Sequence, residues 1–224
     1  MEELIFIILI LLTILTTFCI YKILDKRGLY FSLVIINLLS YILSFKIAYV
    51  FKMNINLNII PLIGIMIILY IINAKYGSKE NKNIIIILLI TNIITSCSLA
   101  VLNFFTPAIT ETISINMQAT FEHNYKIIIF YPLITLLSEL SIIKLSQILL
   151  SINKNILICV LLTYIITGLI YTLIFCILSY ISTLTLYNSI FIGISTYIIG
   201  IPITLINLIL VQSIINKKVK RWEI

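Results

Sequence analysis

The chain has 224 residues, of which 62% are hydrophobic and only 10% are charged, with a formal net charge of +7. Soluble domains carry about a quarter charged residues, so this composition excludes a soluble globular protein and predicts a single unit that lives in lipid. The positive charge is interpreted as a signal of membrane topology, and no nucleic-acid partner is expected.

Seven apolar segments follow one another along the chain. They are too long for the strands of a membrane barrel, and open sheet edges cannot face lipid, so each segment predicts a transmembrane helix. The joints between them are short and polar, and none has the composition of a domain linker. The predicted fold is an all-α integral membrane protein, a single transmembrane domain over residues 1–224. The predicted helices are Leu4–Tyr21, Leu29–Val50, Leu57–Asn73, Ile84–Phe105, Ile127–Ser151, Ile156–Tyr180 and Ser189–Ile215.

Lysine and arginine are concentrated on one side of this predicted bundle. Eleven lie in the first, third and fifth joints and the C-terminal tail, against only Lys52 and Lys126 in the second and fourth joints. Because cytoplasmic loops carry an excess of these residues, the N-terminus is predicted outside and the C-terminus in the cytoplasm. We expect a multi-pass protein of a cell membrane, in a prokaryote the plasma membrane. Its partner is the lipid bilayer, and a homo-oligomer is left open.

An acidic residue lies in the middle of the fifth segment. Glu139 is twelve residues from either end of Ile127–Ser151, about 18 Å along a helix, which is too far to reach water. An ionisable group at this depth costs at least about 2.5–3.5 kcal/mol and usually faces the bundle interior or a polar cavity. Thr135, Glu139 and Ser146 lie on one helical stripe, next to Ser138, so this stripe is predicted to face other helices. Both a functional and a hydrogen-bonded structural role for Glu139 remain open.

Two lysines are the other ionisable side chains within the predicted spans. Lys144 lies about 140° around the helix from Glu139 and can extend its amine to the nearer membrane interface. Lys46, close to the outer end of its helix, can do the same. Alternatively, Lys46 reaches inward and pairs with Glu139, which would lower the desolvation cost of both groups.

Amide and phenol side chains within the spans are further candidates for a binding site. Asn92 and Asn207 offer hydrogen-bond donors and acceptors, and Tyr70 and Tyr171 offer rings that can stack on a planar solute. The alternative is that such polar groups only hold membrane helices together.

The sequence carries no recognisable enzyme motif. His123 is the single histidine and lies in the predicted outer loop Thr106–Lys126, which excludes a histidine-rich metal site inside the membrane. G-x-S-x-G, H-E-x-x-H and a Gly-rich phosphate loop are all lacking. We therefore expect no enzymatic activity, cofactor or metal. The outer loop is predicted to be solvated or to form a short amphipathic helix on the membrane.

The stretch Leu69–Asn81, LYIINAKYGSKEN, resembles the VUT family of queuosine precursor transporters, which carry T-D-I-x-N/S-E-x-Y-G-K-K-E-A at this place. YKILDKRGLY resembles the family's Y-R-x-F-G-K-R-G-L-Y. SYILSFKIAYVF resembles A-N-I-x-x-x-K-L-V-E-L-F and places Lys46 on the family's lysine. LIYTLIF and TYIIGIPITLINLIL resemble L-I-D-T-V-I-F and T-Y-L-I-K-V-I-V-A-L-L-D-T-P in the same order.

This resemblance implies import of a small planar heterocycle, a deazaguanine-type queuosine precursor, without an ATPase in this chain. A guanine-type edge presents adjacent N–H donors that one carboxylate can accept together. Glu139 would be this acceptor or a proton-coupling site, and Lys46 would be its partner or a donor to a carbonyl. The other residues implied for the site are Asn207 and Asn92 as polar lining and Tyr70 or Tyr171 as a stacking wall.

The chain departs from the family pattern at several polar positions. They are Leu69 and Tyr70 in place of the T-D pair, Ala74 in place of the glutamate, Gly168 and Tyr171 at polar positions, and Gly200 and Asn207 in place of a lysine and an aspartate. Two alternatives therefore stand beside queuosine precursor import. One is transport of a different small planar solute. The other is a non-transporting membrane subunit that docks a cytoplasmic partner through its basic tail, Lys217–Arg221.

Overall fold

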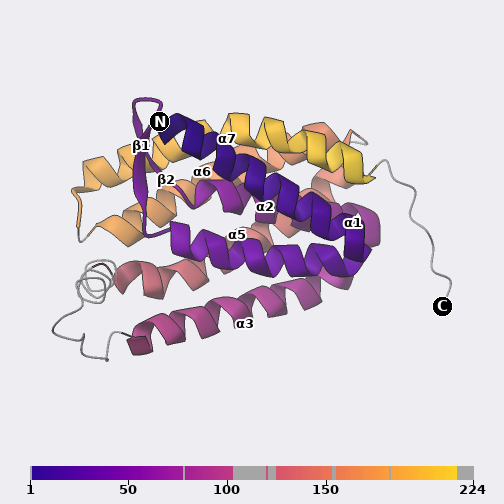
Figure 1. Cartoon of the computed structure of the whole chain (residues 1–224), viewed down its shortest axis with the longest axis horizontal. Coiled ribbons are helices and arrows are strands. Elements are labelled where there is room, and N and C mark those ends of the chain that lie inside the picture. The colour runs from indigo at the N-terminus through magenta and orange to yellow at the C-terminus, as the bar shows by residue number, and fades with distance from the viewer. Residues whose placement is uncertain are drawn as a thin grey trace.

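The computed structural model describes residues 2–77, 79–102, 120, 125–152, 155–181 and 183–215. Within these ranges, six helices are long and apolar enough to cross a membrane, and they run side by side along the longest axis of the molecule (Figure 1). The predicted all-α membrane architecture is confirmed. The elements are α1 (Glu2–Leu43), β1 (Ile47–Val50), β2 (Met53–Asn56), α2 (Ile59–Tyr76), α3 (Lys79–Leu102), α5 (Tyr125–Ile152), α6 (Ile156–Tyr180) and α7 (Leu186–Ile215).

The first two predicted segments form the two arms of α1. Asp25, between them, has φ 48° and ψ −124°, which lies outside the helical region. The chain reverses direction there, so the arms lie side by side (Figure 1). Gly28 follows this reversal, and a Cβ at its position would lie 2.4 Å from the carbonyl oxygen of Ile20. Only a glycine therefore fits at this position beside the first arm.

A β-hairpin replaces the end of the second predicted helix. The prediction of a helix from Leu29 to Val50 is wrong beyond Leu43, because β1 pairs antiparallel with β2 instead. Phe51 and Lys52 form the two-residue turn, and both have positive φ, 50° and 62°. Positive φ at both central residues is typical of the type I′ turn, whose twist matches that of paired strands.

The hairpin also changes the position of Lys46. This residue lies between α1 and β1, and its side chain is exposed. The prediction that Lys46 is an ionisable group inside a membrane helix is therefore wrong. A short apolar run does not distinguish a strand from a helix by composition alone, which is why the sequence pattern missed the change.

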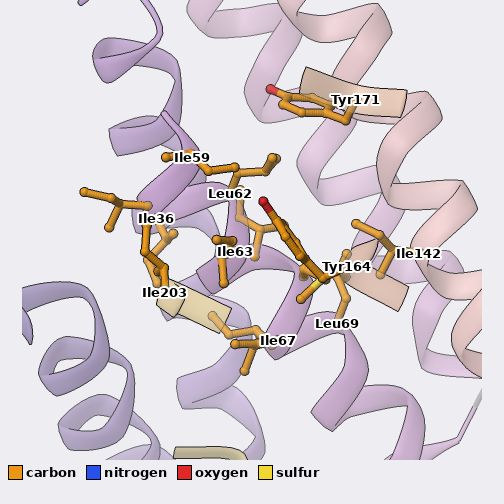
Figure 2. Close-up of a cluster of buried hydrophobic side chains, with 14 of the residues drawn as sticks. Ile36, Ile59, Leu62, Ile63, Ile67, Leu69, Ile142, Tyr164, Tyr171 and Ile203 are labelled. Atoms are coloured by element: carbon orange, nitrogen blue, oxygen red, sulfur yellow. The ribbon is translucent and has the colours of Figure 1, made fainter. Parts of the chain in front are cut away.

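α2 is the central helix of the bundle. All of its residues from Ile59 to Asn73 are buried, and it contacts α1, α3, α5, α6 and α7. Figure 2 shows its isoleucines and Leu62 packed against Ile36 of α1, Ile142 of α5, Tyr164 of α6 and Ile203 of α7. A helix that is apolar all round is expected to be buried in this way. The surrounding helices instead expose apolar side chains outward, as suits contact with lipid.

The remaining predicted spans agree with α2, α3, α5, α6 and α7 to within a few residues at the described ends. Most of the predicted outer loop, including His123, lies outside the described residues, and so does the basic tail Lys217–Arg221. The predictions made for these two segments stay predictions, as does the orientation of the bundle in the membrane.

Candidate functional site

The polar stripe predicted on α5 faces the interior of the bundle. Thr135, Glu139 and Ser146 are exposed by only 1%, 2% and 0%, and the neighbouring Ser138 is also buried. Leu137, on the opposite side of the helix, is 65% exposed. The prediction that this stripe faces other helices is confirmed.

Two members of the stripe are bonded to asparagines on other helices. The amide of Asn92 on α3 donates to the Thr135 hydroxyl over 3.1 Å, and the amide of Asn73 on α2 donates to the Ser146 hydroxyl over 2.8 Å. Asn92 also accepts from the Asn37 amide of α1 at 2.8 Å. These contacts are the helix-joining hydrogen bonds expected of polar groups in a membrane bundle. Asn92, a predicted lining residue, therefore links α1, α3 and α5.

Glu139 lies between these bonded pairs and differs from both. Neither carboxyl oxygen has a hydrogen-bond partner in the described part of the chain, and both are buried. Leaving a buried polar group unsatisfied costs about 1–3 kcal/mol, and more if it is charged. Of the two alternatives for Lys46, the pair with Glu139 does not form, because Lys46 is exposed at the hairpin. The Glu139 carboxyl thus has acceptor sites that no described residue uses.

Two tyrosines interact electrostatically with this carboxyl. The phenols of Tyr131 on α5 and Tyr171 on α6 are close enough to interact with it electrostatically. Tyr171 stacks on Phe175 with ring centroids 5.7 Å apart and planes 5° apart, and its hydroxyl accepts from the Asn58 amide at 3.2 Å. The structure therefore brings together Glu139 and Tyr171, two of the predicted site residues.

Asn58 belongs to a buried hydrogen-bond network that the sequence analysis missed. Its backbone N–H donates to the side-chain oxygen of Asn56 at 2.8 Å. The Asn56 amide in turn donates to the Ser44 carbonyl, at 2.9 Å, and to the Tyr180 hydroxyl. The network ties the hairpin to α6 and reaches Tyr171 beside Glu139. The signal was the alternating N-I-N-L-N run at 54–58, which places three asparagines at every second residue.

A small cavity lies among α2, α5 and α6, next to the Glu139 stripe. Ser138, Thr167 and Tyr171 line it, together with apolar side chains that include Leu62 and Ile63. Figure 2 shows Leu62, Ile63 and the two α6 tyrosine rings in this region. Its volume of about 10 Å³ is close to that of a single water site. A planar heterocycle does not fit into it in this conformation.

A larger groove of about 420 Å³ runs between α5 and α6. Ser138, Thr167 and Tyr171 line this groove as well as the small cavity. These three buried side chains therefore lie between the small cavity and the groove.

The other predicted site residues lie elsewhere. Asn207 is buried on α7 and donates to the Ile203 carbonyl of its own helix at 2.9 Å. Tyr70 is fully buried on α2, next to the Cys159 thiol. Neither side chain lines the cavity or the groove. Glu139 does not line either of these spaces, so it shares no cavity with Asn207 or Tyr70.

Comparison of the chain with protein-family models, with curated proteins and with solved structures finds no match. The function must therefore be inferred from the chemistry of the site, above all from the Glu139 carboxyl, which has no hydrogen-bond partner among the described residues.

Proposed function

We propose that this membrane protein transports a small planar solute and that Glu139 accepts hydrogen bonds from it. The observation that carries the proposal is the state of Glu139, which is 2% exposed with no hydrogen-bond partner among the described residues for either oxygen. An ionisable residue held inside a membrane bundle marks a substrate or proton pathway more often than a structural contact. The bonded Thr135 and Ser146 on either side show that the same helix face can satisfy polar groups where the fold needs them.

The resemblance to queuosine precursor transporters supplies the solute class. A deazaguanine edge presents adjacent N–H donors, and a carboxylate can accept both with its two oxygens. The phenols of Tyr131 and Tyr171 would then border the bound ring. The same carboxyl would serve as a proton-coupling site if transport follows a proton gradient.

The described conformation corresponds to a closed state in this proposal. A cavity of about 10 Å³ leaves no room for the solute, so α5 and α6 must separate to admit it. Ser138, Thr167 and Tyr171 are the side chains that would move apart, because they lie between the cavity and the groove. Opening and closing of helices around a fixed site is the usual means of alternating access.

The test is uptake of labelled queuosine precursor by a host that cannot synthesise it. Wild-type protein is expected to support uptake, and Glu139→Gln to reduce it at least about tenfold, since a charge-assisted hydrogen bond contributes about 1.5–3 kcal/mol. Lys46→Met is the matched control and should retain uptake, because this lysine is exposed at the hairpin. Full uptake by Glu139→Gln would contradict the assignment of Glu139 to the binding site. If wild-type protein is present in the membrane but supports no uptake, queuosine precursor is not its substrate.

The second candidate is a non-transporting membrane subunit, and the water-sized cavity favours it. A bundle without an open path to Glu139 is what such a subunit requires. In this case no planar solute would be taken up, and a cytoplasmic partner would copurify with the full chain. Removal of the basic tail Lys217–Arg221 would abolish the copurification, whereas the transporter proposal expects uptake to survive this truncation.

A further inference from the structure

We propose that the groove between α5 and α6 is a binding site for one anionic phospholipid. The inference concerns the outer surface of the bundle and does not depend on the proposed transport activity. It rests on the shape of the groove, on the charged residue Lys144 that lines it, and on the position of this residue along α5.

The shape of the groove suits an acyl chain. Its lining residues on α5 extend from Ile134 to Ile148, about 21 Å at the helical rise of 1.5 Å per residue. One leaflet of the hydrocarbon core is about 15 Å thick, half of the roughly 30 Å of the whole core. The walls are apolar side chains that the bundle leaves exposed, among them Leu137, Ile170 and Ile174. An acyl chain of one leaflet can therefore lie along the groove.

Among the described residues, Lys144 is the only charged side chain that lines the groove. It is exposed, and within the described ranges no acidic side chain forms a salt bridge with it. An ammonium group on the lipid-facing side of a membrane helix is costly unless it reaches water or an anion. A lipid phosphate supplies this anion while the lysine stem packs along the apolar wall.

The position of Lys144 matches the polarity of a lipid. It lies eight residues from the end of α5 at Ile152, whereas the groove continues from it past the midpoint of the helix to Ile134. A headgroup at Lys144 would therefore direct its chain toward the bilayer centre. The distribution of lysine and arginine predicts this end of α5 on the cytoplasmic side, where anionic lipids attract basic side chains.

The floor of the groove gives this site a physical link to the interior. Ser138, Thr167 and Tyr171 lie beneath the proposed chain and also line the small cavity. A lipid chain in the groove would cover these three side chains and hold the interior closed.

Native mass spectrometry of the detergent-purified full chain, mixed with equal amounts of phosphatidylglycerol and phosphatidylcholine, tests the proposal. We expect one phosphatidylglycerol to be retained in preference to phosphatidylcholine. Lys144→Gln should reduce this preference about fivefold, the equivalent of about 1 kcal/mol. Lys46→Gln, which removes another exposed lysine, should leave it unchanged.

Ser141→Trp tests the groove independently of the charge, since Ser141 is an exposed lining residue and a tryptophan there would fill the space. It should reduce retention of both lipids. Equal retention of the two lipids by wild type, or an unchanged preference in Lys144→Gln, would overturn the proposal. A lipid-free dimer that protects residues 137–148 from labelling would also overturn it, because a second copy of the chain would then occupy the groove.

Discussion

The two faces of α5 carry charge in opposite ways. Glu139 and Lys144 are five residues apart on one helix, about 140° around its axis, yet Glu139 is 2% exposed and Lys144 is exposed. The lysine has a flexible stem and an open groove, so water or a lipid phosphate can satisfy it. Packed helices enclose the Glu139 carboxyl, so neither water nor a lipid phosphate can reach it. The comparison shows that an outward charge can be accommodated by the surroundings, whereas an inward charge needs a partner from the fold or from a ligand.

The polar residues on the inward face of α5 also differ among themselves in whether they have a partner. Thr135 and Ser146 each accept from an asparagine of a neighbouring helix, and Glu139 between them accepts from no described residue. The bonded pairs contribute to helix association, as polar contacts in membranes usually do. Glu139 makes no such hydrogen bond to a described residue. For this reason we propose that its carboxyl binds a ligand.

Moving the acid to the outer face should have the largest effect. In the double variant Leu137→Glu with Glu139→Leu, the composition is unchanged but the carboxyl points to lipid from a position that is 65% exposed. Insertion should become less favourable by about 2.5–3.5 kcal/mol, and the amount of protein in the membrane fraction should fall sharply. Leu137→Met is the control. Wild-type levels of the double variant would show that burial is not what makes the acid tolerable.

Removing an amide partner of the stripe should have the next largest effect. Asn92→Leu breaks the bonds to Asn37 and Thr135 and leaves their polar groups buried, at a cost of about 1–2 kcal/mol. Thermal unfolding in detergent should report a lower Tm. Asn83→Leu, an exposed position on the same helix, should change the Tm much less. Equal Tm values for the two variants would contradict the assigned network.

Removing a single hydroxyl of the stripe should lower the unfolding free energy by a smaller amount. Ser146→Ala removes the acceptor of Asn73, and interhelical hydrogen bonds in membranes contribute about 0.6 kcal/mol on average. Ser141→Ala is a matched control on the outer face, since its exposed hydroxyl donates only to the Leu137 carbonyl of its own helix. The unfolding free energy should fall for Ser146→Ala and stay constant for Ser141→Ala. A fall in unfolding free energy for Ser141→Ala but not for Ser146→Ala would contradict the assignment of the inward and outward faces of α5.

The smallest expected effect is on the pH dependence of the unfolding free energy. It concerns Glu80, a carboxylate with bonding partners that lies outside the apolar span Asn83–Leu102. Lys26 lies 2.8 Å from the Glu80 carboxylate and Tyr30 donates to it, and these hydrogen bonds lower the pKa of Glu80. Because the folded pKa is below the unfolded value of about 4.3, this stabilisation is present above that pH and is lost as the pH falls through the folded pKa. The pair is partly exposed, so the effect is about 0.3 kcal/mol. Glu80→Gln should remove this part of the acid dependence of unfolding, and an unchanged dependence would contradict it.

The sequence predicted much of the fold and part of the site. Apolar length located the helices, and the spacing of Thr135, Glu139 and Ser146 identified the inward face of α5. Lys46 was misplaced because the apolar strand β1, Ile47–Val50, cannot be told from the end of a membrane helix by composition. The partners Asn73 and Asn92 belong to other helices, and the stripe of one helix does not specify which side chain it will meet. The Asn56 network depends on the same tertiary pairing between the hairpin and α6.

The unfolding free energy of Glu139→Met tests most directly whether this carboxyl lacks a partner in the fold. Methionine is unbranched and of similar size, and replacing an unsatisfied polar group by an apolar one is neutral or stabilising. We therefore expect Glu139→Met to match or exceed wild type in stability while it loses uptake. A loss of about 2 kcal/mol or more would show that the carboxyl makes bonds that stabilise the bundle, and would contradict its assignment to a ligand.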